Sequence, residues 1–357
     1  MKKNILLIFS SLFITLLFME IFLQKFYYKE NFTFDYKKKF ILYEQGNVFR
    51  NIDNNFFTYY PNSNIRTSLY YYDEKLIKVY DYNIITNNLG LVQKNNIKEN
   101  HPSILILGDS FTEGQGSSSW IDNFQGHFKS FQVINGGILG TGPQQFLSLE
   151  NYLSSKANIK YVFVLYVGDD FRRSIFTHND QAINCLKSYK LCNGSEIFYG
   201  FPLNTLNPSV FLQDMKKERE QSEIKITFKK IRRNFKKKIT ELYIYKIPNS
   251  FLKNNFYKSK NEKIITNFKA IEDLINKYQD KIYFVNLKQK QEILFKKESY
   301  ETIYAQKFIK SKTKNNFNCN FDNNLNNFYL YDAHLNKKGY KNLYSCILNI
   351  FNSLNLN

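Results

Sequence analysis

The stretch from Ile104 to Gly114, ILILGDSFTEG, constrains the fold of this chain more than any other segment. Its four consecutive aliphatic residues, Ile104 to Leu107, are typical of a strand buried on both faces of a parallel sheet. The run stops at Gly-Asp-Ser, which places Ser110 at the carboxyl end of the strand, where ligand sites of open α/β sheets lie. The segment therefore predicts an α/β protein with a serine nucleophile at the edge of its sheet.

A serine hydroxyl is a weak nucleophile unless a histidine, itself oriented by a carboxylate, takes its proton. The segment YDAHLNKKGY supplies such a pair, because Asp332 precedes His334 by two residues and an apolar Tyr-Leu-Tyr stretch leads up to it. In an extended or turning segment, residues i and i+2 point to the same side. We therefore expect Asp332 to orient the ring of His334, and His334 to act as the base for Ser110.

Four segments, taken in order, resemble the sequence blocks of the SGNH (GDSL-type) hydrolases from about residue 86 to the C-terminus. In these blocks the resemblance makes Ser110 the nucleophile and assigns the oxyanion donors to the backbone N–H groups of Ser110 and Gly140. The last block usually separates Asp and His by two residues, whereas one residue intervenes here. The matching segments are GDSFTEG, VINGGILGTGPQQ (133–145), YVGDDF (166–171) and DAHLN (332–336), preceded by a similar lead-in, TNNLGL (86–91).

The third block departs from the family pattern at one position. The family has Gly-Asn-Asp, whose Asn side chain donates to the oxyanion, whereas this chain has Gly168, Asp169 and Asp170. An ionised carboxylate accepts hydrogen bonds only, and the loss of an oxyanion donor costs about 2.7–4 kcal/mol. A buried and protonated Asp169 would still donate. We therefore expect reduced or retuned activity rather than an inactive site.

The N-terminal sequence is typical of a membrane-spanning helix. Ile5 to Leu23 comprises 19 residues with a single charge, Glu20, which as a helix spans roughly the ~30 Å hydrocarbon core. No small-residue cleavage site follows, so an uncleaved signal anchor is favoured over a cleaved signal peptide. We expect residues 1–24 to form this anchor, with the catalytic domain in the periplasm or outside the cell.

The net charge and the cysteines bear on whether the chain binds nucleic acid, forms disulfides or holds a metal. The chain carries 50 Lys and Arg against 31 Asp and Glu, a net charge of +19, but no nucleic-acid recognition motif accompanies this charge. The four cysteines permit three disulfide connectivities, one of which joins Cys185 to Cys192 and Cys319 to Cys346; the alternative is that all four are free. No Cys or His spacing suggests a metal site, and no cofactor is implied.

The organisation predicted along the chain is a β-rich cap over residues 25–100 and an SGNH-like domain over 101–357. Alternating strands and helices predict a three-layer α/β/α sandwich with a mostly parallel sheet. The expected strands are Ser103–Leu107, Phe131–Asn135, Tyr161–Val167 and Lys281–Asn286. The expected helices are Trp120–Phe128, Pro143–Ser155, Asn261–Gln279 and about Lys337–Leu354.

A helical insert or lid is expected at about 172–260, where no family block occurs. Within it, residues 224–242 have apolar residues every three or four positions and lysine or arginine on the other faces. Such a basic amphipathic helix is either a lid with a solvated face or an element that contacts an anionic surface.

The function expected from these features is a membrane-anchored serine esterase that forms a Ser110 acyl-enzyme. By the resemblance, its substrate would be an acylated envelope or exported glycan, and the acyl group would pass to water or to a sugar hydroxyl. Two alternatives remain open: a catalytically weak member that binds or presents glycans, for which Asp169 is the reason, and a lipase or lysophospholipase.

Overall fold

The computed structural model describes residues 39–44, 47–72, 75–117, 119–128, 130–178, 262–319 and 324–356, with a few short stretches elsewhere. The chain divides into two units, Met1–Thr33 with Gln213–Asn261, and Phe34–Leu212 with Glu262–Asn357. In the first unit, residue 11 and residues 14–21 are helical. No helix in the described part of the chain is long and apolar enough to cross a membrane. Most of the predicted anchor, the basic helix at 224–242, and both Cys185 and Cys192 lie outside the described residues.

A parallel five-stranded sheet forms the centre of the second unit. Its strands run in the order β11-β10-β8-β6-β7, and every neighbouring pair is parallel. All four strands expected from the sequence are present, within three residues at either end, and the edge strand β11 was not expected. The bounds are Pro102–Gly108 for β6, Gln132–Gly137 for β7, Asn158–Tyr166 for β8, Ile282–Leu287 for β10 and Asn316–Cys319 for β11.

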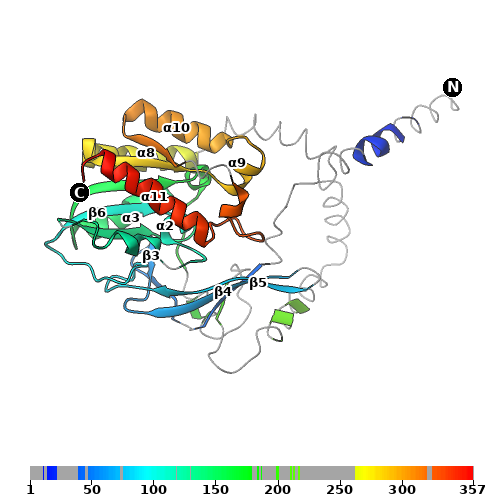
Figure 1. The fold of residues 1–357 in the computed structure, drawn as a ribbon, viewed down its shortest axis with the longest axis horizontal. Helices are drawn as coiled ribbons and strands as arrows, with labels where there is room; N and C mark the ends of the chain where they lie inside the picture. The colour runs from blue at the N-terminus through cyan, green and yellow to red at the C-terminus, as the bar shows by residue number, and fades with distance from the viewer. Residues whose placement is uncertain are drawn as a thin grey trace. The chain divides into compact units, whose positions relative to one another are not determined.

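Helices cover both faces of this sheet, and alternate side chains of β6 pack against the helices on opposite faces. Leu105 and Leu107 pack in one core with residues of α3, α8 and α10, whereas Ile104 and Ile106 pack in a second core with α11 and the 3-10 helix η2. This arrangement confirms the α/β class with a parallel sheet. The helices, labelled in Figure 1 except for η2, are α3 (Pro143–Ser154), α8 (Glu262–Tyr278), α10 (Tyr300–Lys312), α11 (Lys337–Ser353) and η2 (Trp120–Phe124).

The expected helix at Trp120–Phe128 is wrong in type and length. The segment makes only the 3-10 helix η2, and Gly126 follows with φ 102°. The extended backbone of Gln125, with ψ 114°, ends the helix just before this left-handed conformation, which favours glycine. The helix α10 was not expected from the sequence, although Ser299 caps it by accepting a hydrogen bond from the Thr302 N–H.

The N-terminal part of the second unit is a separate, mostly antiparallel sheet. Its order is β5-β4-β1-β9, in which β9 (Phe198–Gly200) pairs parallel with β1. The other strands are β1 (Lys39–Tyr43), β4 (Asn64–Tyr72) and β5 (Leu76–Ile85), and a hairpin joins β2 (Phe49–Asn51) to β3 (Phe57–Tyr59). Buried residues such as Tyr43, Phe57 and Ile84 belong to the same core as α3 and α8. The two sheets therefore share apolar packing.

A disulfide joins Cys319, at the end of β11, to Cys346 in α11, with a Cα–Cα distance of 5.9 Å. This is one of the two pairings considered from the sequence. It ties the edge strand of the parallel sheet to the helix that follows the Asp332–His334 segment.

Candidate active site

Ser110 begins the short helix α2 (Ser110–Glu113) directly after β6. Asp109 caps this helix, since its side chain accepts a hydrogen bond from the Phe111 N–H at 2.9 Å. The turn also requires glycine at position 108. A Cβ there would lie 2.0 Å from the Thr112 hydroxyl and 2.6 Å from the Leu165 carbonyl oxygen. Packing against β8 and α2 thus fixes the position of the serine.

Ser110, His334 and Asp332 come together in the order that the sequence predicted. The Ser110 Oγ lies 2.9 Å from His334 Nε2, and His334 Nδ1 lies 2.6 Å from Asp332 Oδ2. In the neutral tautomer that fits these contacts, Nδ1–H donates to Asp332 and Nε2 accepts from the serine hydroxyl. Burial would raise the pKa of Asp332, but His334 and Lys39 together hold that pKa well below its ordinary value.

The segment that carries Asp332 is held from both sides. The Lys290 ammonium donates to the backbone carbonyls of Tyr329, Leu330 and Asp332 at 2.5, 2.9 and 3.2 Å. Burial lowers the pKa of Lys290 to about 8. On the C-terminal side, Asn336 caps α11 through a 3.1 Å hydrogen bond from the Gly339 N–H. The segment from Asp332 to His334 is therefore held between the Lys290 contacts and the capped start of α11.

The three residues open into a cavity of about 560 Å³. One part of its wall is apolar, with Ile41 and Leu69 from the N-terminal sheet, Leu139 from the loop after β7 and Phe176 from the segment after β8. Another part is polar and comes from the segment around α9 (Lys290–Leu294) and α10, namely Gln289, Gln291, Ser299 and Glu301. The cavity can therefore accept a substrate that has both an apolar and a polar portion.

The expected oxyanion donors lie beside the nucleophile. Gly140, with φ 72°, lines the same cavity as Ser110, and no acceptor for the N–H of Gly140 or Ser110 is found among the described residues. Glu113 holds the preceding residue in place. Its Oε2 accepts from the Leu139 N–H at 2.7 Å, and its Oε1 accepts from the Tyr59 hydroxyl at 3.0 Å. Burial raises the pKa of Glu113 to about 8.

Asp169 also lines the cavity, but its surroundings differ from those of a neutral donor. Its side chain is 26% exposed and forms ion pairs with Arg172 and, at 3.5 Å, with Arg173. A neutral donor would need a buried carboxyl without cationic partners, whereas this one is partly exposed and contacts two guanidinium groups. Asp169 accordingly brings a carboxylate paired with arginine to the cavity wall.

Arg173 links three of the four sequence blocks. Its guanidinium contacts Asp109 of the first block at 2.9 Å, the carbonyl of Thr141 in the second at 2.9 Å, and Asp170 of the third at 2.7 Å. Burial raises the pKa of Asp170, and the Arg173 charge opposes this effect. Arg173 was not predicted as a site residue; the signal in the sequence is its position three residues after Asp170.

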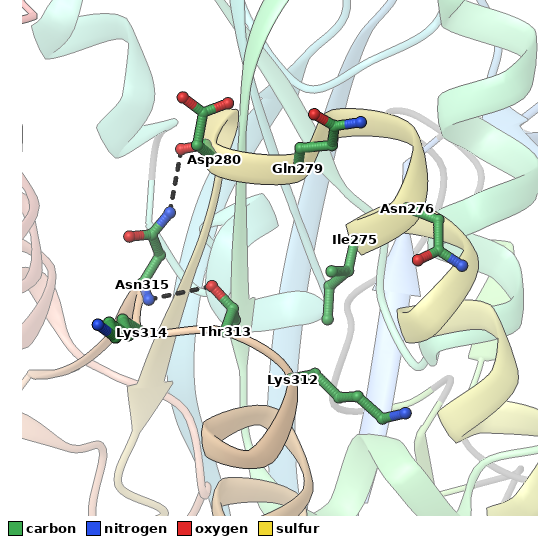
Figure 2. A pocket seen from close by; sticks show the side chains of 8 residues that line it. All are labelled: Ile275, Asn276, Gln279, Asp280, Lys312, Thr313, Lys314 and Asn315. Carbon is green, nitrogen blue, oxygen red and sulfur yellow. Dashed lines mark hydrogen bonds between the residues drawn. The ribbon is translucent and has the colours of Figure 1, made fainter.

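A second pocket, of about 420 Å³, is shown in Figure 2. It is found before the starts of β10 and β11, whereas the catalytic candidates follow the carboxyl ends of β6, β7 and β8. The Asn315 amide donates to the backbone oxygen of Asp280 there, at 3.0 Å. Nothing in its lining continues the chemistry of Ser110. The lining comprises Ile275, Asn276, Gln279, Asp280, Lys312, Thr313, Lys314 and Asn315.

Comparison with known proteins gives matches among solved structures only. No protein-family model matches the sequence, and no curated protein matches it. A lipase/acylhydrolase from Enterococcus faecalis matches 70% of this chain over 95% of its own, at 10% identity and a TM-score of 0.36. A member of the lipolytic protein G-D-S-L family from Veillonella parvula matches 70% over 98% of its own, at 10% identity and a TM-score of 0.33.

The four sequence blocks that contain Ser110, Gly140, Asp169 and His334 resemble those of the SGNH hydrolases.

Proposed function

We propose that this chain is a serine esterase of the SGNH type that acts through a Ser110 acyl-enzyme. The observation that carries the proposal is the contact chain of 2.9 Å from Ser110 to His334 and 2.6 Å from His334 to Asp332, within a cavity large enough for an ester. A nucleophile, its base and the orienting carboxylate in hydrogen-bond reach are what acyl transfer requires.

The chemistry proceeds in two steps. As Ser110 Oγ attacks the ester carbonyl carbon, His334 Nε2 takes the hydroxyl proton, and the N–H groups of Ser110 and Gly140 stabilise the oxyanion. Collapse of this intermediate breaks the ester bond, and His334 returns the proton to the leaving alcohol. In the second step His334 deprotonates water or a sugar hydroxyl, which attacks the acyl carbon; as the bond from this carbon to Ser110 Oγ breaks, His334 returns the proton to the serine oxygen.

The proposed substrate is an O-acylated glycan of the cell envelope or an exported polysaccharide. The mixed lining of the cavity supports this choice, because apolar residues suit an acyl group and polar residues suit a sugar. We further propose that residues 5–23 anchor the chain in a membrane as a single span, with the catalytic domain outside the cytoplasm. In the same proposal, the basic segment 224–242 contacts an anionic surface. The apolar N-terminal run and the charge pattern of the insert support these two statements.

A second candidate function is that of a weakly catalytic glycan-binding protein, and Asp169 is the observation that favours it. A paired carboxylate stands where the family has an amide donor. A lipase is the third candidate, in keeping with the description of the Enterococcus faecalis protein as a lipase/acylhydrolase.

The deciding experiment uses the full chain, purified in detergent, with a fluorophosphonate probe and p-nitrophenyl acetate. We expect covalent labelling of Ser110 and ester turnover, and we expect Ser110→Ala and His334→Ala each to remove nearly all of the turnover. Ser154→Ala, which changes an exposed serine at the end of α3, is the matched control and should behave as wild type. Equal turnover in wild type and Ser110→Ala would refute the esterase. Labelling without turnover of any ester would favour the glycan-binding candidate.

A further inference from the structure

The carboxylate of Asp332 has a second charged partner that comes from the N-terminal sheet. Lys39, the first residue of β1, is only 5% exposed. Its ammonium contacts Asp332 Oδ1, whereas His334 uses Oδ2. The two oxygens of one buried carboxylate are thus divided between the catalytic histidine and a lysine 293 residues away in the sequence.

We propose that Lys39 is a positioning residue of the catalytic set, which orients Asp332 toward His334 and places a positive charge behind it. The proposal rests on the esterase function proposed above. It makes the N-terminal sheet a contributor to the catalytic machinery in addition to a wall of the cavity.

Other contacts between this sheet and the Asp332 segment point the same way. Tyr71 of β4 stacks on Tyr331, with ring centroids 5.0 Å apart and planes 25° apart. Tyr80 of β5 packs against Tyr329 with centroids 5.2 Å apart. Side chains from three neighbouring strands therefore contact the Asp332 segment. Of Lys39, Tyr71 and Tyr80, it is Lys39 that contacts the Asp332 carboxylate.

The charge of Lys39 weakens the electrostatic attraction between Asp332 and the protonated ring of His334. When His334 takes the serine proton it becomes a cation beside Asp332, and a carboxylate already paired with Lys39 attracts that cation less strongly. Removal of Lys39 should strengthen this attraction, so the acid limb of the activity should move to higher pH.

The other titratable groups around Asp332 do not change charge in the same pH range. Lys290 contacts the backbone of the segment, and its pKa of about 8 keeps it protonated at acid pH. The hydroxyls of Tyr80, Tyr82 and Tyr329 also face Asp332, and burial raises the pKa of each above its ordinary value. None of these four groups therefore changes its charge below pH 7.

The test compares the pH profile of kcat/KM for p-nitrophenyl acetate in the full chain and three variants. Lys39→Met removes the charge and should raise the midpoint of the acid limb by about one pH unit, with kcat lowered roughly tenfold through misorientation of the dyad. Lys39→Arg keeps the charge and should return the acid limb to the wild-type position. Lys78→Met, which removes an exposed lysine of β5 that pairs with Asp81, is the matched control and should leave the profile unchanged.

A folded Lys39→Met protein with the wild-type acid limb would overturn the proposal. If circular dichroism shows that Lys39→Met is unfolded, Lys39→Arg decides, since an acid limb displaced by a full unit despite the retained charge would also overturn it. In an Asp332→Asn background, Lys39→Met should slow fluorophosphonate labelling much less than it does in wild type, because contacting residues are non-additive. Failure of the esterase itself would be seen separately, as turnover that survives Ser110→Ala.

Discussion

Replacement of Asp169 by asparagine tests the position at which the site departs from its relatives. Asp169→Asn swaps a carboxylate for a neutral amide of nearly the same shape, and so supplies an N–H donor at the cavity wall. The ion pairs to Arg172 and Arg173 are lost, but Arg173 keeps Asp109 and Asp170 at 2.9 and 2.7 Å. Partly exposed pairs of this kind contribute about 0–1 kcal/mol, so the protein should fold with little loss of stability.

The expected gain in rate follows from what one oxyanion donor supplies. A donor contributes about 2.7–4 kcal/mol, which corresponds to roughly 10²–10³ in kcat. The arginine pairs already neutralise part of the Asp169 charge, so its removal relieves little repulsion. The gain should therefore come from the new donor and reach up to about 10²-fold.

The assay is kcat and KM for p-nitrophenyl acetate, with thermal unfolding measured in parallel. Because a transition-state donor is added, kcat should rise while KM changes little. The matched control is Asp280→Asn, which changes an exposed aspartate at the pocket in Figure 2, at the opposite ends of the strands. If Asp169→Asn leaves kcat unchanged in a folded protein, Asp169 does not face the oxyanion and the match of the third block is wrong.

Three further predictions concern Glu113, the Cys319–Cys346 disulfide and the proposed membrane anchor. The raised pKa of Glu113 means that the folded protein binds a proton between about pH 4.5 and 8 that the unfolded chain releases, so the free energy of unfolding should fall as pH rises through this window. Thermal melts should show this decline, and Glu113→Gln should flatten it. Replacement of both Cys319 and Cys346 by alanine should cost about 3–4 kcal/mol in the free energy of unfolding; an unchanged denaturant midpoint would show that the bond adds nothing. The proposed anchor predicts a chain of unprocessed length that stays with membranes after a carbonate wash. A mature N-terminus between residues 18 and 32 would indicate a cleaved signal instead.

The sequence was most informative where local pattern and chemistry coincide. The apolar runs before Ser110 and at 161–167 predicted buried strands, because a strand covered on both faces is apolar at every position. The strand β11 was not predicted, because its sequence NFNC, at the edge of the sheet, contains few apolar residues. Ser110, His334 and Asp332 could be named because each belongs to a short block with its own signature.

The supporting residues could not be named in the same way. Lys39 is one of the many lysines and arginines of this chain, and nothing around it in sequence distinguishes it from the others. Its role depends on the register of β1 against β4 and on the approach of that sheet to the Asp332 segment. The role of Arg173 likewise depends on the tertiary structure, which brings Asp109, Thr141 and Asp170 into contact with its guanidinium. Such partnerships depend on the tertiary structure, which local sequence patterns do not reveal.

The separation of the contacting residues along the chain has a consequence for the timing of activity. Ser110 and His334 are 224 residues apart, and Lys39 and Asp332 are 293 apart. At ribosomal rates of about 5–20 residues per second, the nucleophile is synthesised roughly 11–45 s before its base. A growing chain therefore carries an unactivated serine for most of its synthesis. A ribosome that stalls before residue 332 leaves a fragment unable to attack the esters around it.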